Sequence, residues 1–575
     1  MSDSEHKHHR FRLRSDVRTH WAVYLGVFLA LLIWCAVDVM VRARVDPEKP
    51  SLHMTDVTVY TEAAKAILAG EDPYQVTNIR GWPYIYPPLF AVLMSPLAPL
   101  PEPWQAAVWF WISVACLLGC YCECRHLLDR VHQSGNTSRR RELIFLGLAF
   151  AAGLLPALNC LQRGQVGLFL LYPLLLGVRL VLTEKNSHQW IWAGVALMLP
   201  VAIKLTPALP VACLAGMLLV QAVLRPHLRP RFAFVTGGLI LGALLHFFLI
   251  PASLVGWNRN LEFLDTFHNN VSSKVNDVRS DDFGGHVASK RNQSLSNAAY
   301  RCGTWVAARL GMGPDDLLAE TPGNQLPMDR PAANLTLLVI RVLALLALGA
   351  ASYKACTRRD RLAWLAAYGL AIVATFVVSP VARGHYFLMW IPGSLFLSLW
   401  MWRQHQHRVA WHVAIWPIVL TTLHYVALDY AGRVGLLGLG TTVWFFLGCH
   451  LLYYSSEDAS FMETGDSPQV RAEFVESMLQ ELLRDPKAVE SAKQAAEEAK
   501  TNKKSRRRSS RRRSSSSQQS SSQQSADEPA SATISPSPTL AIPTSPVPAE
   551  DEEPDDVTPA DPPADGDAVP KEEID

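Results

Sequence analysis

Long apolar stretches separated by short polar segments dominate the chain up to about residue 454. Most are about 20 residues long, which is the length that an α-helix needs to cross the hydrocarbon core of a bilayer. We therefore expect an all-α multi-spanning membrane protein with large external loops. The pattern predicts about 12 transmembrane helices, at approximately 21–41, 103–124, 143–160, 165–183, 190–204, 207–224, 232–254, 332–353, 362–380, 386–402, 409–428 and 433–454.

Two shorter segments are interpreted differently. Segment 88–100 is apolar, but it is too short to span and is broken by Pro96 and Pro99, so we expect it to be re-entrant or interfacial. The residues from Val57 to Ala69 predict a short helix on the outer membrane surface, ended by Gly70. The first apolar stretch is too long for the core of a signal peptide, which favours an uncleaved first helix.

The basic short loops predict the orientation of the helices. Lys and Arg collect in the loops between the second and third, sixth and seventh, eighth and ninth, and tenth and eleventh predicted spans. Cytoplasmic loops carry an excess of these residues. With 12 spans and a cytoplasmic N-terminus, all four basic loops fall on the cytoplasmic side. The chain is thus predicted to be a multi-pass cell-membrane protein with both termini in the cytoplasm.

Composition divides the chain further. The recurring apolar stretches of about 20 residues exclude a soluble enzyme. The charged share of 18% is also below the roughly 25% that is typical of a soluble protein. We expect a cytoplasmic N-terminal segment (1–20), a transmembrane domain (21–454), an amphipathic helical segment (455–504) and a disordered tail (505–575) that is Arg/Ser-rich and then acidic and Pro-rich. If the Arg clusters bind a partner, anionic lipid headgroups are favoured over nucleic acid. A solvated tail without a partner is favoured over both.

Polar residues interrupt the apolar pattern in segments that the predicted topology places on the external side. They include Asp56 in the first loop, Arg163 with Gln165, Lys204, and Arg383 with His385. Charges in or beside the hydrocarbon are costly and usually face a protein cavity. Several basic groups at one external cavity imply an anionic ligand, such as a lipid phosphate, and a single facing carboxylate suggests a general base.

Each of these residues also has a simpler interpretation. Asp56 could cap the helix that begins at Val57, and Asp72 with Pro73 is an ordinary turn signal. Lys204 could extend along the membrane interface and Arg383 could anchor there. From the spacing alone, these alternatives stay open.

Together and in order, these motifs resemble glycosyltransferase family 87, the polyprenol-phosphate-mannose-dependent mannosyltransferases of the multi-spanning C superfamily. The resemblance rests on Asp56, Gly70-Glu-Asp-Pro-Tyr74, Tyr86-Pro-Pro-Leu-Phe90 and Lys204-Leu-Thr-Pro207, with weaker matches at Gly164-Gln165, Asn292-Gln-Ser294 and Ser379-Pro380. It covers about residues 20–455. The chain departs from the family after Ser379-Pro380, where many members have a Trp and paired His and this chain has Arg383-Gly-His-Tyr386.

The resemblance implies an inverting transfer of a hexose, expected to be mannose, from a polyprenyl phosphate carrier to a lipid or glycan acceptor of the cell envelope. Asp56 would be the catalytic base. No cofactor is expected, because the first loop lacks an Asp-x-Asp pair for a divalent metal. The alternatives are a transporter or flippase of a lipid-linked sugar and an inactive scaffold. The substrate-binding residues would be Asp72, Tyr74, Tyr86, Arg163, Gln165, Lys204, Asn292, Gln293, Arg301, Arg383 and His385.

Overall fold

The protein is described from a computed structural model. The structure describes residues 26–46, 48–132, 138–182, 187–272, 292–295, 297–298, 330–358, 360–379 and 381–455. The chain divides into two compact units, Met1–Ala472 and Glu473–Asp575, and all described residues belong to the first. The predicted amphipathic segment and disordered tail, apart from residue 455, lie outside the described residues.

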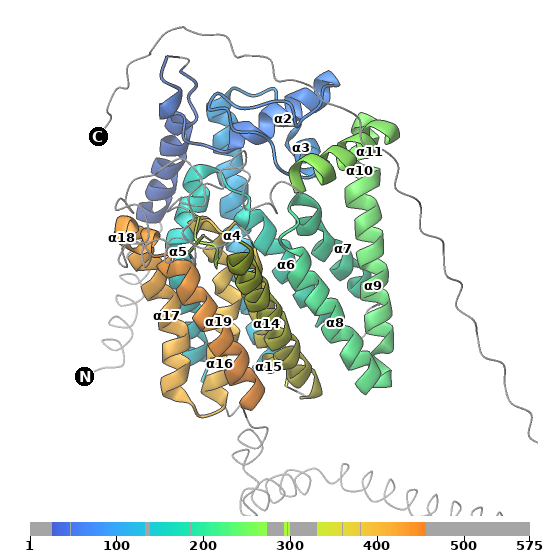
Figure 1. Ribbon diagram of the computed structural model, residues 1–575, viewed down its shortest axis with the longest axis vertical. Coiled ribbons are helices and arrows are strands. Elements are labelled where there is room, and N and C mark those ends of the chain that lie inside the picture. Colours follow the sequence, from blue (N-terminus) through green and yellow to red (C-terminus); the bar gives the residue numbers. More distant parts are fainter. Residues whose placement is uncertain are drawn as a thin grey trace, which may run out of the picture. The chain divides into compact units, whose positions relative to one another are not determined.

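The described residues form helices joined by short connections (Figure 1), with isolated β-bridges only at Thr77–Pro83 and Asn292–Arg383. All twelve stretches predicted to span are helical over most of their described length. They correspond to residues 26–42, α4 (Glu102–Val131), α5 (Arg139–Arg163), α6 (Gly167–Val181), α7 (Ser187–Ile203), α8 (Ala208–Leu224), the run from α9 (Arg229–Ala243) through η3 (Leu244–Leu249) to α10 (Ile250–Val255), α14 (Arg330–Thr357), α15 (Arg361–Val378), η6 (Gly384–Met389) with α16 (Trp390–Arg403), α17 (His407–Val426) and α19 (Leu436–Tyr454). The all-α multi-spanning class is confirmed.

Seven helices within the described part of the chain are long and apolar enough to cross a membrane, and α6, α7 and α8 are shorter apolar helices. The number of twelve crossings stays a prediction. The short helix expected in the first loop is present as α2 (Val57–Ala69). Segment 88–100, expected to be re-entrant or interfacial, begins with the short helix α3 (Pro88–Met94). Helix α2 ends at Gly70, whose φ of 77° lies in the left-handed region that favours glycine.

The centre of the bundle is built from α15 and α16, whose side chains are almost all buried. These helices approach closely because Gly369 faces Gly393: a Cβ on Gly369 would lie 2.7 Å from the Gly393 Cα. Such contact between small residues lets helix backbones pack tightly inside a membrane, where burial of apolar surface alone gives no drive for association.

Arginine side chains bind the C-terminal ends of three helices. Arg225 donates to the carbonyl oxygens of Thr357 (2.9 Å), the last residue of α14, and of Arg358 (2.8 Å), which follows it. Arg403 donates to the carbonyl of Val131 at the end of α4. Arg358 in turn donates to the carbonyl of Leu452 in α19 (2.6 Å). These cations satisfy carbonyls that have no partner within their own helices. They come from the basic loops that predicted the cytoplasmic side.

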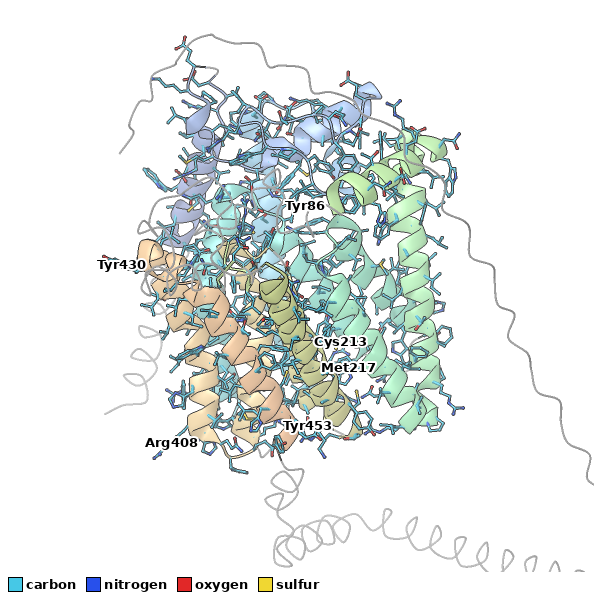
Figure 2. All side chains as sticks on the ribbon, in the orientation of Figure 1. Tyr86, Cys213, Met217, Arg408, Tyr430 and Tyr453 are labelled. Carbon is cyan, nitrogen blue, oxygen red and sulfur yellow. The ribbon has the colours of Figure 1, made fainter. Side chains whose placement is uncertain are left out.

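The opposite end of the bundle carries the first loop. Figure 1 shows α2 and α3 there, together with α10 and α11 (Trp257–Thr266). Figure 2 places Tyr86 toward this end, and Arg408 and Tyr453 at the other. The structure therefore separates the predicted site residues from the basic loops.

Candidate functional site

Asp56 lies immediately before α2, but its carboxylate does not cap the helix. The side chain makes no capping hydrogen bond, whereas the N–H of Val57 donates to Thr55 Oγ1 (3.3 Å). The interpretation of Asp56 as a capping side chain is therefore wrong. Its own N–H donates to the carbonyl of Arg163 (2.9 Å), which ties the loop to the end of α5.

Gly164 permits this junction. It follows α5 with a φ of 67°, and a Cβ at this position would overlap Val57 Cγ2 and lie 3.0 Å from Thr55 Oγ1. The Trp109 indole N–H donates to the Gly164 carbonyl (2.9 Å) and fixes the turn from the side of α4. A residue with a side chain would push the end of α5 away from Asp56, so glycine is required here for two independent reasons.

Three cations surround the Asp56 carboxylate. Arg163 Nη2 lies 3.9 Å from Asp56 Oδ1, and Arg383 and Lys204 are also close enough to act electrostatically on the carboxylate. Only 13% of the Asp56 side chain is exposed. Burial raises the pKa of Asp56 above its ordinary value of 3.8, and the three cations oppose that rise.

Lys204, directly after α7, reaches the same place from the other side. Its ammonium group donates to the Tyr386 hydroxyl and lies over two aromatic rings, 4.2 Å from the centroid of Tyr386 and 5.2 Å from that of Tyr86. The Tyr86 and Tyr60 hydroxyl oxygens are 3.5 Å apart. In the described residues, no carboxylate lies within ion-pair distance of Lys204, so its charge is balanced by ring faces and a hydroxyl.

The Arg383 loop is held by a segment distant in sequence. Asn292 Oδ1 accepts from the N–H groups of Ala382 (3.0 Å) and Ser294 (3.1 Å), and the Gln293 N–H donates to the Ala382 carbonyl (2.6 Å). Gln293 Nε2 also donates to the carbonyl of Gly432 (3.0 Å). These contacts give Asn292 and Gln293 a structural part in placing the loop, and their contact with substrate stays a prediction.

His385 is 2% exposed, and its Nε2 has no hydrogen-bond partner among the described residues. Its ring meets that of Tyr386 edge to face at 4.4 Å, and it interacts electrostatically with Lys204, Arg383 and Arg163. A buried polar atom without a partner is uncommon and calls for an explanation. A ligand oxygen in the site would supply one.

Other predicted residues shape the first loop. Asp72 Oδ1 accepts from the Tyr74 N–H (2.9 Å), which is the turn that its sequence indicated, and the Tyr74 hydroxyl donates to the Tyr86 carbonyl (3.0 Å). Gln165 is buried, and its N–H donates to the Cys160 carbonyl (2.9 Å). Their roles toward substrate stay predictions, and Arg301 lies outside the described residues.

The structure adds residues that sequence reasoning missed. Tyr386 was noted only as a departure from the family, and His53 was not singled out. His53 is buried, its Nδ1 lies 3.3 Å from the Arg44 carbonyl and its Nε2 lies 2.7 Å from Thr58 Oγ1. No group of three or more His, Cys, Asp or Glu that could hold a metal is found in the described ranges. Independence of a divalent metal stays a prediction.

Comparison with known proteins assigns the chain to a family. The profile of glycosyltransferase family 87 matches residues 84–380, which is just over half of the chain. The chain belongs to this family and is a membrane glycosyltransferase. Among solved structures, a crystal structure of ArnT from Cupriavidus metallidurans bound to undecaprenyl phosphate is similar, with a TM-score of 0.36, 15% sequence identity, and coverage of 75% of this chain and 78% of that chain. No curated protein matches the chain.

Proposed function

We propose that the protein transfers a hexose, mannose by family likeness, from a polyprenyl phosphate carrier to a lipid or glycan acceptor on the external face of the cell membrane. Asp56 is the general base, and transfer inverts the configuration at the anomeric carbon. The observation that carries the proposal is one largely buried carboxylate among Arg163, Lys204 and Arg383.

The chemistry needs only this one carboxylate. Asp56 takes the proton of an acceptor hydroxyl while the hydroxyl oxygen attacks the anomeric carbon. The bond from that carbon to the phosphate oxygen breaks, and its electron pair leaves with the polyprenyl phosphate. Because the new bond forms opposite the one that breaks, no glycosyl-enzyme intermediate is required, and a second carboxylate acting as nucleophile has no place.

Charge balance supports a phosphate leaving group. With histidine counted as neutral, three positive groups and one carboxylate give the cluster a formal charge of +2. A sugar phosphodiester carries one negative charge, and the phosphomonoester that leaves carries up to about two near neutral pH. The cations therefore interact more strongly with the leaving phosphate than with the bound donor, which lowers the barrier rather than only improving binding.

Burial supports Asp56 as the base. A raised pKa makes the carboxylate a better proton acceptor than an exposed Asp, and the neighbouring cations still favour its ionised form. The carboxylate is also not occupied by helix capping, since the Asp56 side chain makes no capping hydrogen bond.

A transfer assay in membranes tests the proposal. Membranes from cells expressing the protein should move label from a polyprenyl-phosphate mannose to a new acceptor product, whereas membranes from a strain lacking it should not. The anomeric configuration of the product should be opposite to that of the donor. Movement of intact donor across the membrane of vesicles, without a glycosylated product, would instead identify a transporter or flippase. Absence of both transfer and movement would indicate a scaffold.

A further inference from the structure

The hydroxyl of Tyr386 forms the hydrogen bond that fixes the end of Lys204. The Lys204 ammonium donates to this oxygen and lies over the Tyr386 ring at 4.2 Å, with the Tyr86 ring at 5.2 Å. A lysine side chain has four rotatable bonds and three N–H donors. One donor is held by Tyr386, which leaves two for a ligand.

The Tyr386 ring is itself fixed by its surroundings. It lies in η6, against the buried His385 ring at 4.4 Å. The Tyr386 N–H donates to the Arg383 carbonyl (2.9 Å), and Asn292 and Gln293 hold the chain just before it. The hydroxyl therefore has a defined position, whereas the Lys204 ammonium would have several without it.

We propose that Tyr386 is a positioning residue that acts through Lys204, holding the ammonium where it binds the phosphate of the donor. This inference rests on the proposed function, because it requires Lys204 to contact the phosphate. Two other roles for Tyr386 are distinct from this one. The ring alone could serve in packing, and the Tyr386 hydroxyl could bind the phosphate directly.

A double-mutant cycle separates these roles. Tyr386→Phe keeps the ring and removes only the hydroxyl, and Lys204→Met keeps the length of the side chain and removes its charge. Binding of undecaprenyl phosphate to the purified full-length protein in lipid nanodiscs is measured for each variant, with undecaprenol as the probe without phosphate. Tyr368→Phe is the matched control, because its hydroxyl is buried in α15 without a hydrogen bond in the described residues.

The expected pattern is specific. Tyr386→Phe weakens undecaprenyl phosphate binding by about 3- to 10-fold, the usual loss for one ordinary hydrogen bond, because Lys204 keeps its charge and loses only its fixed position. Lys204→Met weakens it more, and Tyr386→Phe in the Lys204→Met background has no further effect, because nothing remains to be positioned. Undecaprenol binding and the Tyr368→Phe control stay at wild-type levels. In turnover, Tyr386→Phe raises the KM for the donor and also lowers kcat, because Lys204 acts on the phosphate both in the bound donor and as it leaves.

Other results overturn the inference in distinguishable ways. Equal losses from Tyr386→Phe with and without Lys204 would mean that the hydroxyl binds phosphate directly. Unchanged binding in Tyr386→Phe while Lys204→Met binds weakly would leave only packing for Tyr386. If Lys204→Met binds undecaprenyl phosphate as tightly as wild type, the phosphate role of Lys204 in the proposed function fails, and the role of Tyr386 fails with it.

Discussion

The backbone N–H of Asp56 donates to the carbonyl oxygen of Arg163 at 2.9 Å, and the Arg163 guanidinium lies 3.9 Å from the Asp56 carboxylate. One junction thus fixes the position of the acid while leaving its side chain free of any capping bond. It also places a cation beside the acid. The geometry of the base depends on the turn that ends α5 as much as on α2.

Substitution of Gly164 tests this dependence. Gly164→Ala should lower the melting temperature in detergent and reduce transferase activity, because alanine is strained at a φ of 67° and its Cβ overlaps Val57 Cγ2. The two effects together cost about 2 to 4 kcal/mol. Adding Val57→Ala should restore part of the loss by removing the overlap but not the strain. A Gly164→Ala protein with wild-type melting temperature and activity would contradict the junction.

The pH dependence of kcat/KM reports the ionisation of Asp56. The base must be ionised to accept a proton, so activity should fall as the pH is lowered through its pKa. Because burial raises that pKa above 3.8, the acid limb should lie at higher pH than for an exposed Asp. Arg163→Gln removes a cation that opposes the rise, so its acid limb should move to still higher pH. A limb that stays in place in Arg163→Gln would argue against Asp56 as the titrating group.

Sequence reasoning predicted the helices well because their cause is local. The bounds of α2, from Val57 to the glycine at position 70, follow from apolar spacing and a left-handed stop, and neither depends on distant parts of the chain. The gathering of Asp56, Lys204 and Arg383 was also predicted. Four predicted spans separate each of these residues from the next, and an even number of spans places their loops on one side of the bilayer.

The contacts within the site could not be predicted in this way. Whether Asp56 caps α2 depends on the direction of its side chain, which makes no capping bond and lies 3.9 Å from Arg163 Nη2 instead. The part of Asn292 in holding Ala382, and that of Tyr386 in holding Lys204, depend on how segments far apart in sequence pack. Hydrophobic pattern and charge counting carry no information about such packing.

Labelling of single cysteines tests the orientation. A Cys at Thr77, an exposed position in the first loop, should react with a membrane-impermeant maleimide in intact cells. A Cys at Gly135, in the predicted cytoplasmic loop after α4, should react only after permeabilisation. The reverse pattern would put the site on the cytoplasmic side and overturn the external assignment.

Truncation should show where the catalytic domain ends. Ser455 accepts a hydrogen bond from the Trp400 indole N–H (2.9 Å) at its hydroxyl and one from Arg358 at its carbonyl. A protein ending at residue 457 keeps these contacts and should retain most activity, since the tail is predicted to be cytoplasmic and the site external. A protein ending at residue 451 should lose membrane abundance. Inactivity of the longer protein at normal abundance would show that the tail takes part in function.

Substitution of Asp56 tests the mechanism most directly. Asp56→Asn keeps the size and removes the base, and the backbone hydrogen bond to Arg163 is unaffected because it does not involve the side chain. Turnover should fall by about 10² to 10⁴, while binding of the polyprenyl phosphate donor stays near normal. Lys204→Ala should instead weaken donor binding and slow the departure of the phosphate together. Glu62→Gln is the control and should keep wild-type turnover. It removes a carboxylate of the neighbouring helix α2, which pairs with Lys65 at 2.8 Å. The comparison is made at equal protein abundance, with binding and turnover measured separately. Transfer by Asp56→Asn at the wild-type rate would remove this carboxylate from the reaction and leave the cations of the site as a binding cluster alone.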